Sequence, residues 1–434
     1  MNHGAILYET WSVCPVCLKR IYAERIQIEN KVFLQKCCPE HGSYRTIIWR
    51  GYYGINDWIG NTESPAHKDP RCPSGCGLCP DHLGDTCCVI LNVTHQCNLE
   101  CRYCFDRQGN HGNEPTLDEI RASLRQLTKK GKSLVQLSGG EPTTRPDLHE
   151  IIKAAKDAGA KYVQLNTNGI RLGEYKEYVS RLAGAGLSFV FMQFDGTDDQ
   201  IYNKLRGRPL LRIKQKAIEN CAACNIGVTL VPTLVRDCNI HNIGSILRFA
   251  VSQSPNVRGV HFQPVTYLGR IEKIPEDSDR ITLDELIAEI HKQTDGMIHP
   301  NNLLPSACDH PLCGFHGDFV VIQDRLVPLL AKGMNAPACC GDPQQAAAKN
   351  REFIAKRWLR TSEEREGQEW ETGDIHDMEY FLRRVKTHGF TVTSMAFQDA
   401  GNLDFSRLRN CSLHVFDQGK FIPFCSYYLQ KWDM

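Results

Sequence analysis

The stretch NVTHQCNLECRYCF, residues 92–105, decides the fold of this chain. It carries three cysteines in a C-x3-C-x2-C spacing, Cys97, Cys101 and Cys104. Three thiolates so spaced can each bind one iron of a 4Fe–4S cluster, and the fourth iron is left without a nearby protein ligand. An open iron can bind a small molecule, so the spacing indicates a cluster that takes part in chemistry. A zinc knuckle or three buried free thiols are the alternatives.

The segment SGGEP, residues 138–142, follows about one helix later. Together the two motifs resemble the radical S-adenosylmethionine (SAM) superfamily, which has this cysteine spacing and a GGEP segment. The resemblance implies that Gly139 and Gly140 let the backbone approach the amino group of SAM and that Glu141 accepts a hydrogen bond from it. Tyr103 and Phe105, beside the last thiolate, would limit the access of water to the cluster.

The composition limits the number of domains and the class of protein. The chain has 434 residues, of which 41% are apolar, enough for two or three domains with a sizeable core. Its net charge of +1 gives no reason to expect a nucleic acid partner. The 21 cysteines, without a secretory type of N-terminus, favour reduced, metal-binding thiols in the cytoplasm. No apolar run reaches the length of about 18 residues that a membrane span needs.

The N-terminal segment contains two cysteine motifs, CPVC and CCPEHG, separated by a hairpin pattern. The candidate ligands are Cys14, Cys17, Cys38 and either Cys37 or His41. Two such motifs suit a tetrahedral mononuclear site that holds zinc or a rubredoxin-like iron. A ribbon with free thiols is the alternative, but so short a ribbon has little core of its own without a metal.

From residue 87 to residue 295, short β-branched runs alternate with amphipathic helical patterns. The expected strands are 87–94, 133–138, 161–166, 187–194, 226–233 and 258–264. The expected helices include 117–130 and 283–294, each preceded by a capping box. The pattern alone fits either a doubly wound sheet or a partial barrel. The resemblance selects an α/β fold with a partial (β/α)6 TIM-like barrel.

Polar residues at the carboxyl ends of the expected strands are candidates for binding SAM, because ligands of parallel α/β folds lie at that edge. They are Asn166, Asn168, Gln193 and Asp195, beside the GGE segment, with Gln263 at the end of the last strand. For each of them, a loop cap or turn former is the ordinary alternative.

Further cysteines suggest auxiliary clusters. The stretch CSLHVFDQGKFIPFC predicts a hairpin about Asp-Gln-Gly that would place Cys411 opposite Cys425, as two ligands of one cluster or as a disulfide. Two closed 4Fe–4S clusters need eight ligands, and the candidates are Cys72, Cys76, Cys79, Cys308, Cys313, Cys340 (or Cys339), Cys411 and Cys425. The other thiols are interpreted as packing residues: Cys87, Cys88, Cys221, Cys224 and Cys238.

These patterns divide the chain into four parts. They are a rubredoxin-like metal module at 1–60, an auxiliary-cluster loop at 61–86, the partial barrel at 87–297 and a C-terminal auxiliary-cluster region at 298–434. The expected cofactors are therefore three 4Fe–4S clusters, SAM and one mononuclear iron or zinc.

The order of the motifs, from CPVC and CCPEHG through CPSGCGLCP to RNC and GKFIPFCSY, resembles one branch of the superfamily. That branch contains the archaeal tetraether lipid synthase and the related dihydropterin methyltransferase. The resemblance implies that the reduced cluster cleaves SAM and that the 5′-deoxyadenosyl radical abstracts hydrogen from an unactivated carbon. An external electron donor of the flavodoxin or ferredoxin type is implied as well.

Three functions compete at this point. We expect an enzyme that joins lipid alkyl chains, with a radical SAM methylase of a pterin-like small molecule second. An iron–sulfur electron carrier comes third, because a carrier gains nothing from an open iron. The basic segment REFIAKRWLR, residues 351–360, could lie on an anionic membrane surface, and a solvated amphipathic helix is the alternative.

Overall fold

The computed structural model describes residues 4–60, 72–73, 78–79, 81–105, 114–268, 275–306, 308–332, 343–360 and 377–430. The predicted ligands Cys76, Cys339 and Cys340 lie outside these described residues.

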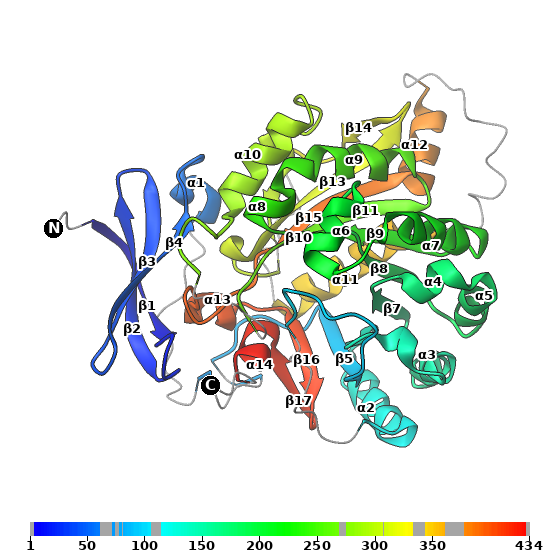
Figure 1. Cartoon of the computed structure of the whole chain (residues 1–434), viewed down its shortest axis with the longest axis horizontal. Coiled ribbons are helices and arrows are strands. Elements are labelled where there is room, and N and C mark those ends of the chain that lie inside the picture. The colour runs from blue at the N-terminus through cyan, green and yellow to red at the C-terminus, as the bar shows by residue number, and fades with distance from the viewer. Residues whose placement is uncertain are drawn as a thin grey trace.

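The N-terminal part of the chain is an antiparallel sheet with the strand order β1-β2-β3-β4. Its strands are β1 (Ala5–Val13), β2 (Arg20–Ile28), β3 (Lys31–Cys38) and β4 (Gly42–Trp49). The short helix α1 (Ile55–Ile59) follows. Figure 1 shows this ribbon beside the main body of the molecule. Because β1 and β3 both end in a cysteine motif, the two motifs meet at one end of the ribbon.

Six parallel strands form the centre of the second sheet, each paired with the next one along the chain except for the short β10. They are β5 (Cys88–Thr94), β6 (Leu134–Gly139), β7 (Tyr162–Thr167), β8 (Phe189–Gln193), β9 (Gly227–Val231) and β11 (Val257–Pro264). Every expected strand is present within a few residues of its predicted bounds. The prediction of a partial barrel is confirmed.

Helices follow these strands, and most of them lie on the outer side of the curved sheet (Figure 1). They are α2 (Leu117–Lys129), α3 (Leu148–Asp157), α4 (Ile170–Glu174), α5 (Lys176–Gly184), α6 (Asp199–Arg206), α7 (Leu211–Ala223), α8 (Arg236–Asn239), α9 (Ile243–Ser252) and α10 (Leu283–Gln293). The capping box of α2 is formed by Thr116 and Glu119, as predicted. At α10 the predicted box is wrong, because Glu285 instead binds the guanidinium groups of Arg50 and Arg236.

The C-terminal part of the chain extends this same sheet at both edges. Strand β15 (Gly389–Met395) pairs in parallel with β11, and β16 (Leu413–Asp417) pairs in parallel with β5. The remaining elements are β10 (Thr233–Leu234), β12 (Leu304–Pro305), β13 (Gly314–Ile322), β14 (Arg325–Pro328), β17 (Lys420–Pro423), α11 (Pro343–Trp358), α12 (Met378–Thr387), α13 (Phe405–Arg409) and α14 (Phe424–Gln430).

The predicted C-terminal hairpin exists, but it does not pair its two cysteines. Strands β16 and β17 join through Gln418 and Gly419, which both have positive φ, so Asp417 pairs with Lys420. Cys411 precedes β16, and Cys425 lies in α14. The prediction that they face each other across the hairpin is wrong, because the chain turns into a helix directly after Pro423.

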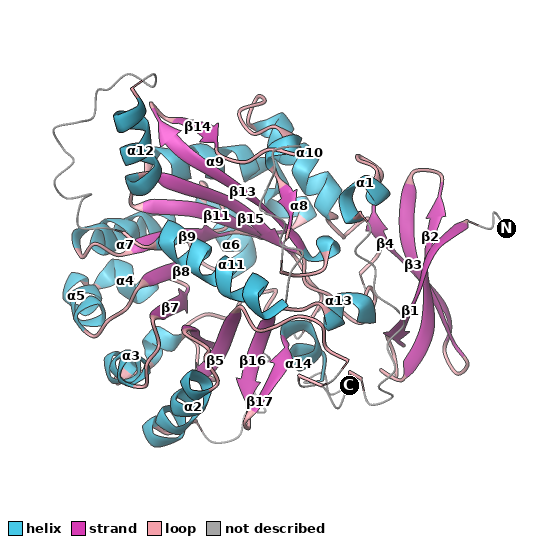
Figure 2. Cartoon of the chain, turned by 180° about the vertical axis from the view of Figure 1, so that it is seen from behind, coloured by secondary structure: helices cyan, strands magenta, loops and turns pink. Residues whose placement is uncertain are grey.

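The basic segment 351–360 forms most of α11, which Figure 2 shows lying across the strands of the barrel sheet. Arg351 is buried and donates to the carbonyl of Cys87, and Arg357 pairs with Asp318 at 2.6 Å. The interpretation as a membrane-surface helix is wrong, because these cations bind groups of the protein itself. Among the described residues, no helix has the length and apolar character that crossing a bilayer requires.

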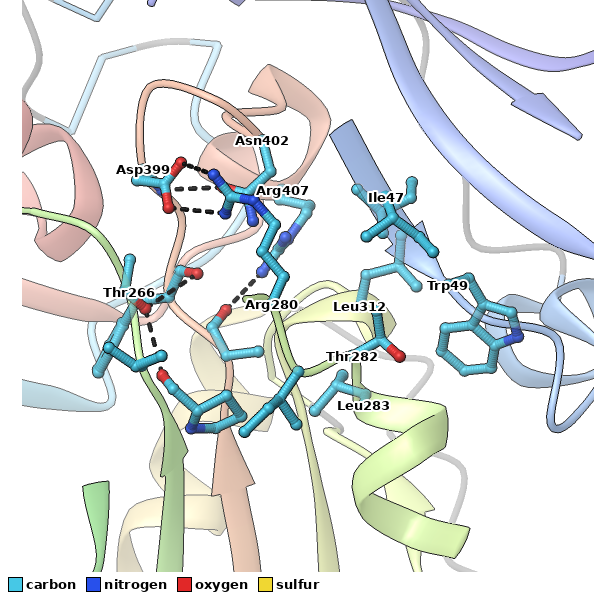
Figure 3. A pocket seen from close by; sticks show the side chains of 16 residues that line it. Ile47, Trp49, Thr266, Arg280, Thr282, Leu283, Leu312, Asp399, Asn402 and Arg407 are labelled. Atoms are coloured by element: carbon cyan, nitrogen blue, oxygen red, sulfur yellow. Dashed lines mark hydrogen bonds and ion pairs between the residues drawn. The ribbon is translucent and has the colours of Figure 1, made fainter. Parts of the chain in front are cut away.

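Buried polar contacts fasten the ribbon to the C-terminal segment. Arg25 on β2 and Asp404 form an ion pair at 2.6 Å, with both side chains almost fully buried. Lys36 on β3 donates to the carbonyl of Ala400 at 2.6 Å. At the same junction, Figure 3 shows a small pocket of about 40 Å³, where Arg280 and Asp399 share two hydrogen bonds of 2.8 and 3.0 Å.

Replacement of Asp404 by Asn should destabilise the protein by roughly 3–5 kcal/mol, because it leaves the buried charge of Arg25 unpaired. Burial alone would raise the pKa of Asp404, but the charge of Arg25 outweighs it and holds this pKa well below its ordinary value. The difference in the free energy of unfolding between the native chain and the variant should therefore be largest above about pH 4 and should shrink as the pH falls below that value.

Urea unfolding at several pH values measures this difference. The matched control is Glu40→Gln, which breaks the exposed pair of Glu40 with Lys19 and should change stability little. Equal effects of the two variants would contradict the importance of the Arg25 pair.

Candidate active site

A cavity of about 340 Å³ opens at the carboxyl ends of the barrel strands. Its size lies in the usual range for a small-molecule site. The predicted residues that line it are Cys97, Cys101, Cys104, Gly139, Gly140, Glu141, Asn166, Asn168, Gln193 and Gln263. These residues come from loops and strand ends spread over more than 160 positions, and the barrel brings them to one mouth. The donor set suits a thiolate-bound iron–sulfur cluster with a ligand beside it.

The loop that carries the three cysteines is held by the GGE segment. The Gly140 N–H donates to the carbonyl of Thr94 at 2.9 Å, and the Glu141 N–H donates to that of Gln96 at 2.8 Å. A Cβ at Gly140 would lie 2.3 Å from the Gln96 oxygen. Both glycines are therefore required for contact with the cysteine loop, a reason that the resemblance did not supply.

The carboxylate of Glu141 is occupied by the protein itself. One oxygen accepts from the hydroxyls of Thr143 and Thr167 at 2.6 Å each, and the other accepts from the Asn168 N–H at 2.6 Å. The side chain of Asn168 donates to Asn98 in the cysteine loop at 2.7 Å. Both predicted cofactor contacts thus also join β6, β7 and the cysteine loop into one unit.

Asp195 is the predicted site residue that the structure removes from the cavity lining. It is fully buried and binds Arg206 through two hydrogen bonds of 2.7 and 2.8 Å. Arg206 does line the cavity and donates toward the sulfur of Cys101. Asp195 therefore orients the guanidinium that contacts Cys101, and Asp195 itself is not among the residues that line the cavity.

Burial raises the pKa of the Cys97 thiol to about 12, with a further contribution from the charge of Glu141. A free thiol at this position is protonated at neutral pH. Binding of iron must release that proton, because the thiolate is the form that ligates metal.

Sequence reasoning missed Lys214 on α7, whose ammonium group lies under the mouth of the barrel. It is fully buried and donates to the carbonyl of Asn168 and, at 2.7 and 2.8 Å, to the carbonyl and side-chain oxygens of Gln193. Burial lowers its pKa to about 7. The residue ties the end of β7 to the end of β8. An amphipathic helix pattern gives no signal for such a contact.

Polar residues also point into the barrel from positions before the strand ends. Gln136 on β6 and His261 on β11 line the cavity, and burial lowers the pKa of His261 to about 4, so the imidazole is neutral. His261 contacts the Thr393 hydroxyl at 2.8 Å. Alternation of polar and apolar residues along the strands was the signal that could have identified them.

Aromatic rings form the apolar part of the cavity wall. Phe105 packs edge to face with Phe397 and Phe424, at centroid distances of 5.6 and 5.4 Å. Across the cavity lining, Phe191 lies 4.5 Å from the ring of Trp358 on α11. The predicted shielding role fits Phe105, whereas Tyr103 packs against Tyr267 and is not among the cavity-lining residues.

The cysteines predicted as auxiliary ligands fall into two places. Cys313, Cys411 and Cys425, which we name the sealed thiol group, influence one another electrostatically and do not line the cavity in the described part of the chain. Arg407 donates to Cys313 at 3.4 Å, and Cys72 packs in the same apolar cluster as Cys425. Cys79 lies in the neighbouring loop, where its carbonyl accepts from the N–H of His82.

Cys308 does not join this group but lies against Cys87. Cys87 and Cys88 pack with Leu134, Phe189 and Trp358 in a buried apolar cluster, as predicted, and both also line the cavity. Cys221 and Cys238 are buried among apolar side chains, as predicted, and Cys224 packs against the core.

The ribbon holds a compact ligand set at its tip. The ligand atoms of Cys14, Cys17, Cys38 and His41 all lie within 4.8 Å of one another, so they can hold one metal ion. This set contains His41, one of the two predicted alternatives, whereas Cys37 is exposed and is not part of it.

Comparison with known proteins gives two family matches. The Radical SAM superfamily model matches residues 91–250, and the HMPTM N-terminal zinc ribbon domain model matches residues 6–50. The chain is 32% identical to a 7,8-dihydro-6-hydroxymethylpterin dimethyltransferase of Methanocaldococcus jannaschii, over 96% of this chain and 93% of that protein.

Two further relatives match over shorter stretches. A probable GTP 3′,8-cyclase of Methanococcus maripaludis is 31% identical over 40% of this chain and 58% of its own length. Among solved structures, Streptococcus suis SuiB bound to precursor peptide SuiA has a TM-score of 0.39 and 16% identity, over 50% of this chain and 46% of that chain.

Replacement of Cys38 by Ser should abolish binding of one metal ion by the ribbon and unfold it, whereas Cys37→Ser should leave it unchanged. We expect the ion to be zinc, because three thiolates with one imidazole are typical of structural zinc sites. Elemental analysis measures the zinc content of the two purified variants. Equal zinc in both variants would contradict the assignment, and iron in its place would revive the rubredoxin-like alternative.

Replacement of Gly140 by Ala should displace the cysteine loop and lower the iron content of the protein, because the new methyl group meets the Gln96 carbonyl. The cost should be roughly 1–3 kcal/mol, as for other overpacked sites. Gly184 at the end of α5 is the control, since no atom lies within 4 Å of its added Cβ. Normal iron content in Gly140→Ala would show that the contact is dispensable.

Proposed function

Because the chain belongs to the radical SAM superfamily of iron–sulfur enzymes, with a relative matched along almost its whole length, we propose that it methylates a small, pterin-like heteroaromatic molecule. Sequence reasoning ranked this reaction second, behind the joining of lipid chains. The relative matched along almost its whole length is named a dimethyltransferase of a dihydropterin, and neither its name nor that of the cyclase relative mentions the coupling of lipids. The electron-carrier interpretation is set aside, because members of this superfamily are enzymes.

The observation that carries the proposal is the mixed lining of the cavity. Gln136, His261 and Gln263 offer neutral hydrogen-bonding groups, and aromatic rings offer flat apolar surface. An alkyl chain would leave such groups unsatisfied at a cost of roughly 1–3 kcal/mol each, whereas the edge of a pterin could bond to them.

In this proposal Cys97, Cys101 and Cys104 hold a 4Fe–4S cluster, and the GGE segment with Asn166 and Gln193 holds SAM. The bound group supplies one-electron reductive cleavage of a carbon–sulfur bond of SAM. The protein positions the bound groups and shields them from water. Gly140 and Glu141 hold the cysteine loop, and Phe105 keeps water from the cavity.

His261 has a separate role in orienting the substrate. Because its imidazole is neutral, it can donate or accept one hydrogen bond inside the cavity without placing a charge beside the reacting atoms. A second SAM serves as the methyl donor. An external electron donor must reduce the cluster before each turnover.

An anaerobic assay of the cluster-loaded full chain tests the function. The chain is incubated with SAM, a low-potential reductant and either 7,8-dihydro-6-hydroxymethylpterin or a lipid extract. With the pterin present, we expect 5′-deoxyadenosine and S-adenosylhomocysteine to rise together. The pterin should gain the mass of one CH2 unit per methylation, because a methyl group replaces the hydrogen that leaves in 5′-deoxyadenosine. Coupled lipids with 5′-deoxyadenosine alone would restore the lipid reaction, and no turnover of either substrate would refute both.

The variant His261→Phe should lower turnover of the pterin roughly 10- to 100-fold, through loss of one buried hydrogen bond, and should spare SAM cleavage without substrate. The control is His388→Phe, at a half-buried histidine that does not line the cavity and whose pKa is lowered to about 3, chiefly by desolvation. Equal losses in the two variants would remove His261 from the substrate site.

A further inference from the structure

Sequence reasoning also missed Asp309, a carboxylate that lines the active-site cavity. The residue lies in the loop between β12 and β13, next to Cys308, and is half-buried. The other acidic residue of the described cavity lining is Glu141, which already accepts from two threonine hydroxyls and from the N–H of Asn168. Asp309 is therefore the carboxylate of this lining that has room for a ligand.

Neutral groups of the protein hold Asp309 in position. One carboxylate oxygen accepts from the Ser412 N–H at 2.7 Å, and the other accepts from the Ser306 hydroxyl at 3.2 Å. The thiol of Cys308 lies 3.8 Å from this second oxygen. Since Ser412 precedes β16 and Ser306 follows β12, two separate segments fix the carboxylate. Its position is therefore set before any ligand binds.

Within the described part of the chain, no lysine or arginine pairs with Asp309. Arg206 is the cation of the described cavity lining, and Asp195 occupies it through two hydrogen bonds. An ionised carboxylate has about four lone-pair sites, so the protein leaves part of the accepting capacity of Asp309 unused. Carboxylates removed from bulk water are normally paired or fully hydrogen-bonded. A ligand with N–H donors would complete this one.

Asp309 lies at the end of the cavity away from the GGE segment. Its partner Ser412 directly precedes Leu413, which pairs with Cys88 at the start of β5. The GGE segment lies at the other end, where β6 ends, and β6 runs parallel to β5. About the length of one strand therefore separates Asp309 from the residues assigned to SAM. A group bound at Asp309 would belong to a different ligand.

Flat apolar surface lies beside this carboxylate. Cys308, its neighbour in the chain, packs against the apolar cluster that includes Trp358 and Phe191. Both rings line the cavity. A carboxylate at the margin of aromatic surface suits a planar heterocycle whose edge carries N–H donors. It does not suit an alkyl chain, which would leave the carboxylate desolvated and unpaired.

The pyrimidine ring of a dihydropterin has such an edge, because a ring N–H lies next to an amino group. Two parallel N–H groups can donate to the two oxygens of one carboxylate, as in the bidentate pairing of arginine with aspartate. We propose that Asp309 accepts from the ring N–H and the amino group of a 2-amino-4-oxopyrimidine edge and thereby determines which heterocycle the cavity accepts. This inference rests on the proposed function for the class of substrate, whereas its test measures binding and needs no methyl transfer.

Equilibrium dialysis of the cluster-loaded full chain, with SAM and without reductant, tests the inference. The ligands are 7,8-dihydro-6-hydroxymethylpterin and its 2-oxo analogue, in which an oxygen replaces the amino group. The native chain should bind the pterin roughly 10- to 100-fold more tightly, because the analogue presents an oxygen to the carboxylate in place of a donor. Equal affinity of the native chain for the two ligands would overturn the inference.

Replacement of Asp309 by Asn should reverse this preference. The Asn side chain can accept from the ring N–H and donate to the 2-oxo group, whereas in the pterin its own NH2 group would face another donor. Affinity for the pterin should fall roughly 10- to 100-fold, and affinity for the analogue should rise.

The matched control is Asp277→Asn. Asp277 is also half-buried and accepts a backbone N–H, that of Ile47, at 2.7 Å, but it is not among the described residues that line the cavity. Its variant should keep the preference of the native chain. An unchanged preference in Asp309→Asn, or equal shifts in the two variants, would overturn the inference.

Two further results separate this inference from its neighbours. Weaker binding of SAM in Asp309→Asn with an unchanged preference would overturn it, because Asp309 would then belong to the cofactor site. A chain that prefers the pterin through Asp309 but does not methylate it would support the inference and refute the proposed function alone. Should Asp309→Asn fail to fold, as circular dichroism and loss of the ribbon metal would show, the preference of the native chain decides the matter.

Discussion

The close approach of two backbone segments, residues 94–96 and 139–141, is the constraint on which the rest of the site depends. Two N–H groups of the GGE segment donate to carbonyls of the cysteine loop, at a separation that only glycine allows. Glu141 then joins this contact to the end of β7, and Lys214 joins β7 to β8. The cysteine loop, the glycines and the strand ends therefore form one rigid unit, and rigidity is what a cofactor site requires.

The interior of the barrel combines an apolar wall that excludes water with polar groups that can orient a ligand. Aromatic side chains from the cysteine loop, from α11 and from the C-terminal segment exclude water near the cluster site. Amides and a neutral imidazole on the strands offer hydrogen bonds for orientation. Helix α11 lies across the strands and contributes Asn350, Ile354 and Trp358 to the wall, so part of the cavity is built by the segment that follows the barrel.

Buried charges reinforce an apolar contact between the ribbon and the C-terminal segment, in which Val13 packs in one cluster with Leu403 and Phe405. Arg25 with Asp404 and Arg280 with Asp399 are each almost fully buried. Such pairs add little net stability over apolar residues, but they penalise any other arrangement, because a displaced partner would leave a charge unpaired. The two buried pairs hold α13 and the loop of Cys411 against the barrel. They thereby fix the position of the sealed thiol group, Cys313, Cys411 and Cys425.

The sequence alone determined the elements whose signals are local. The six strands, the capping box of α2, the cysteine triplet and three of the four residues grouped in the ribbon follow from patterns of a few consecutive residues, and the structure contains them. Contacts between distant residues were decided only by the tertiary structure. They include the pairing of Asp195 with Arg206, the burial of α11 and the meeting of Cys87 with Cys308. A local pattern encodes which face of an element is apolar, but not which distant element covers that face, because many partners could bury the same surface.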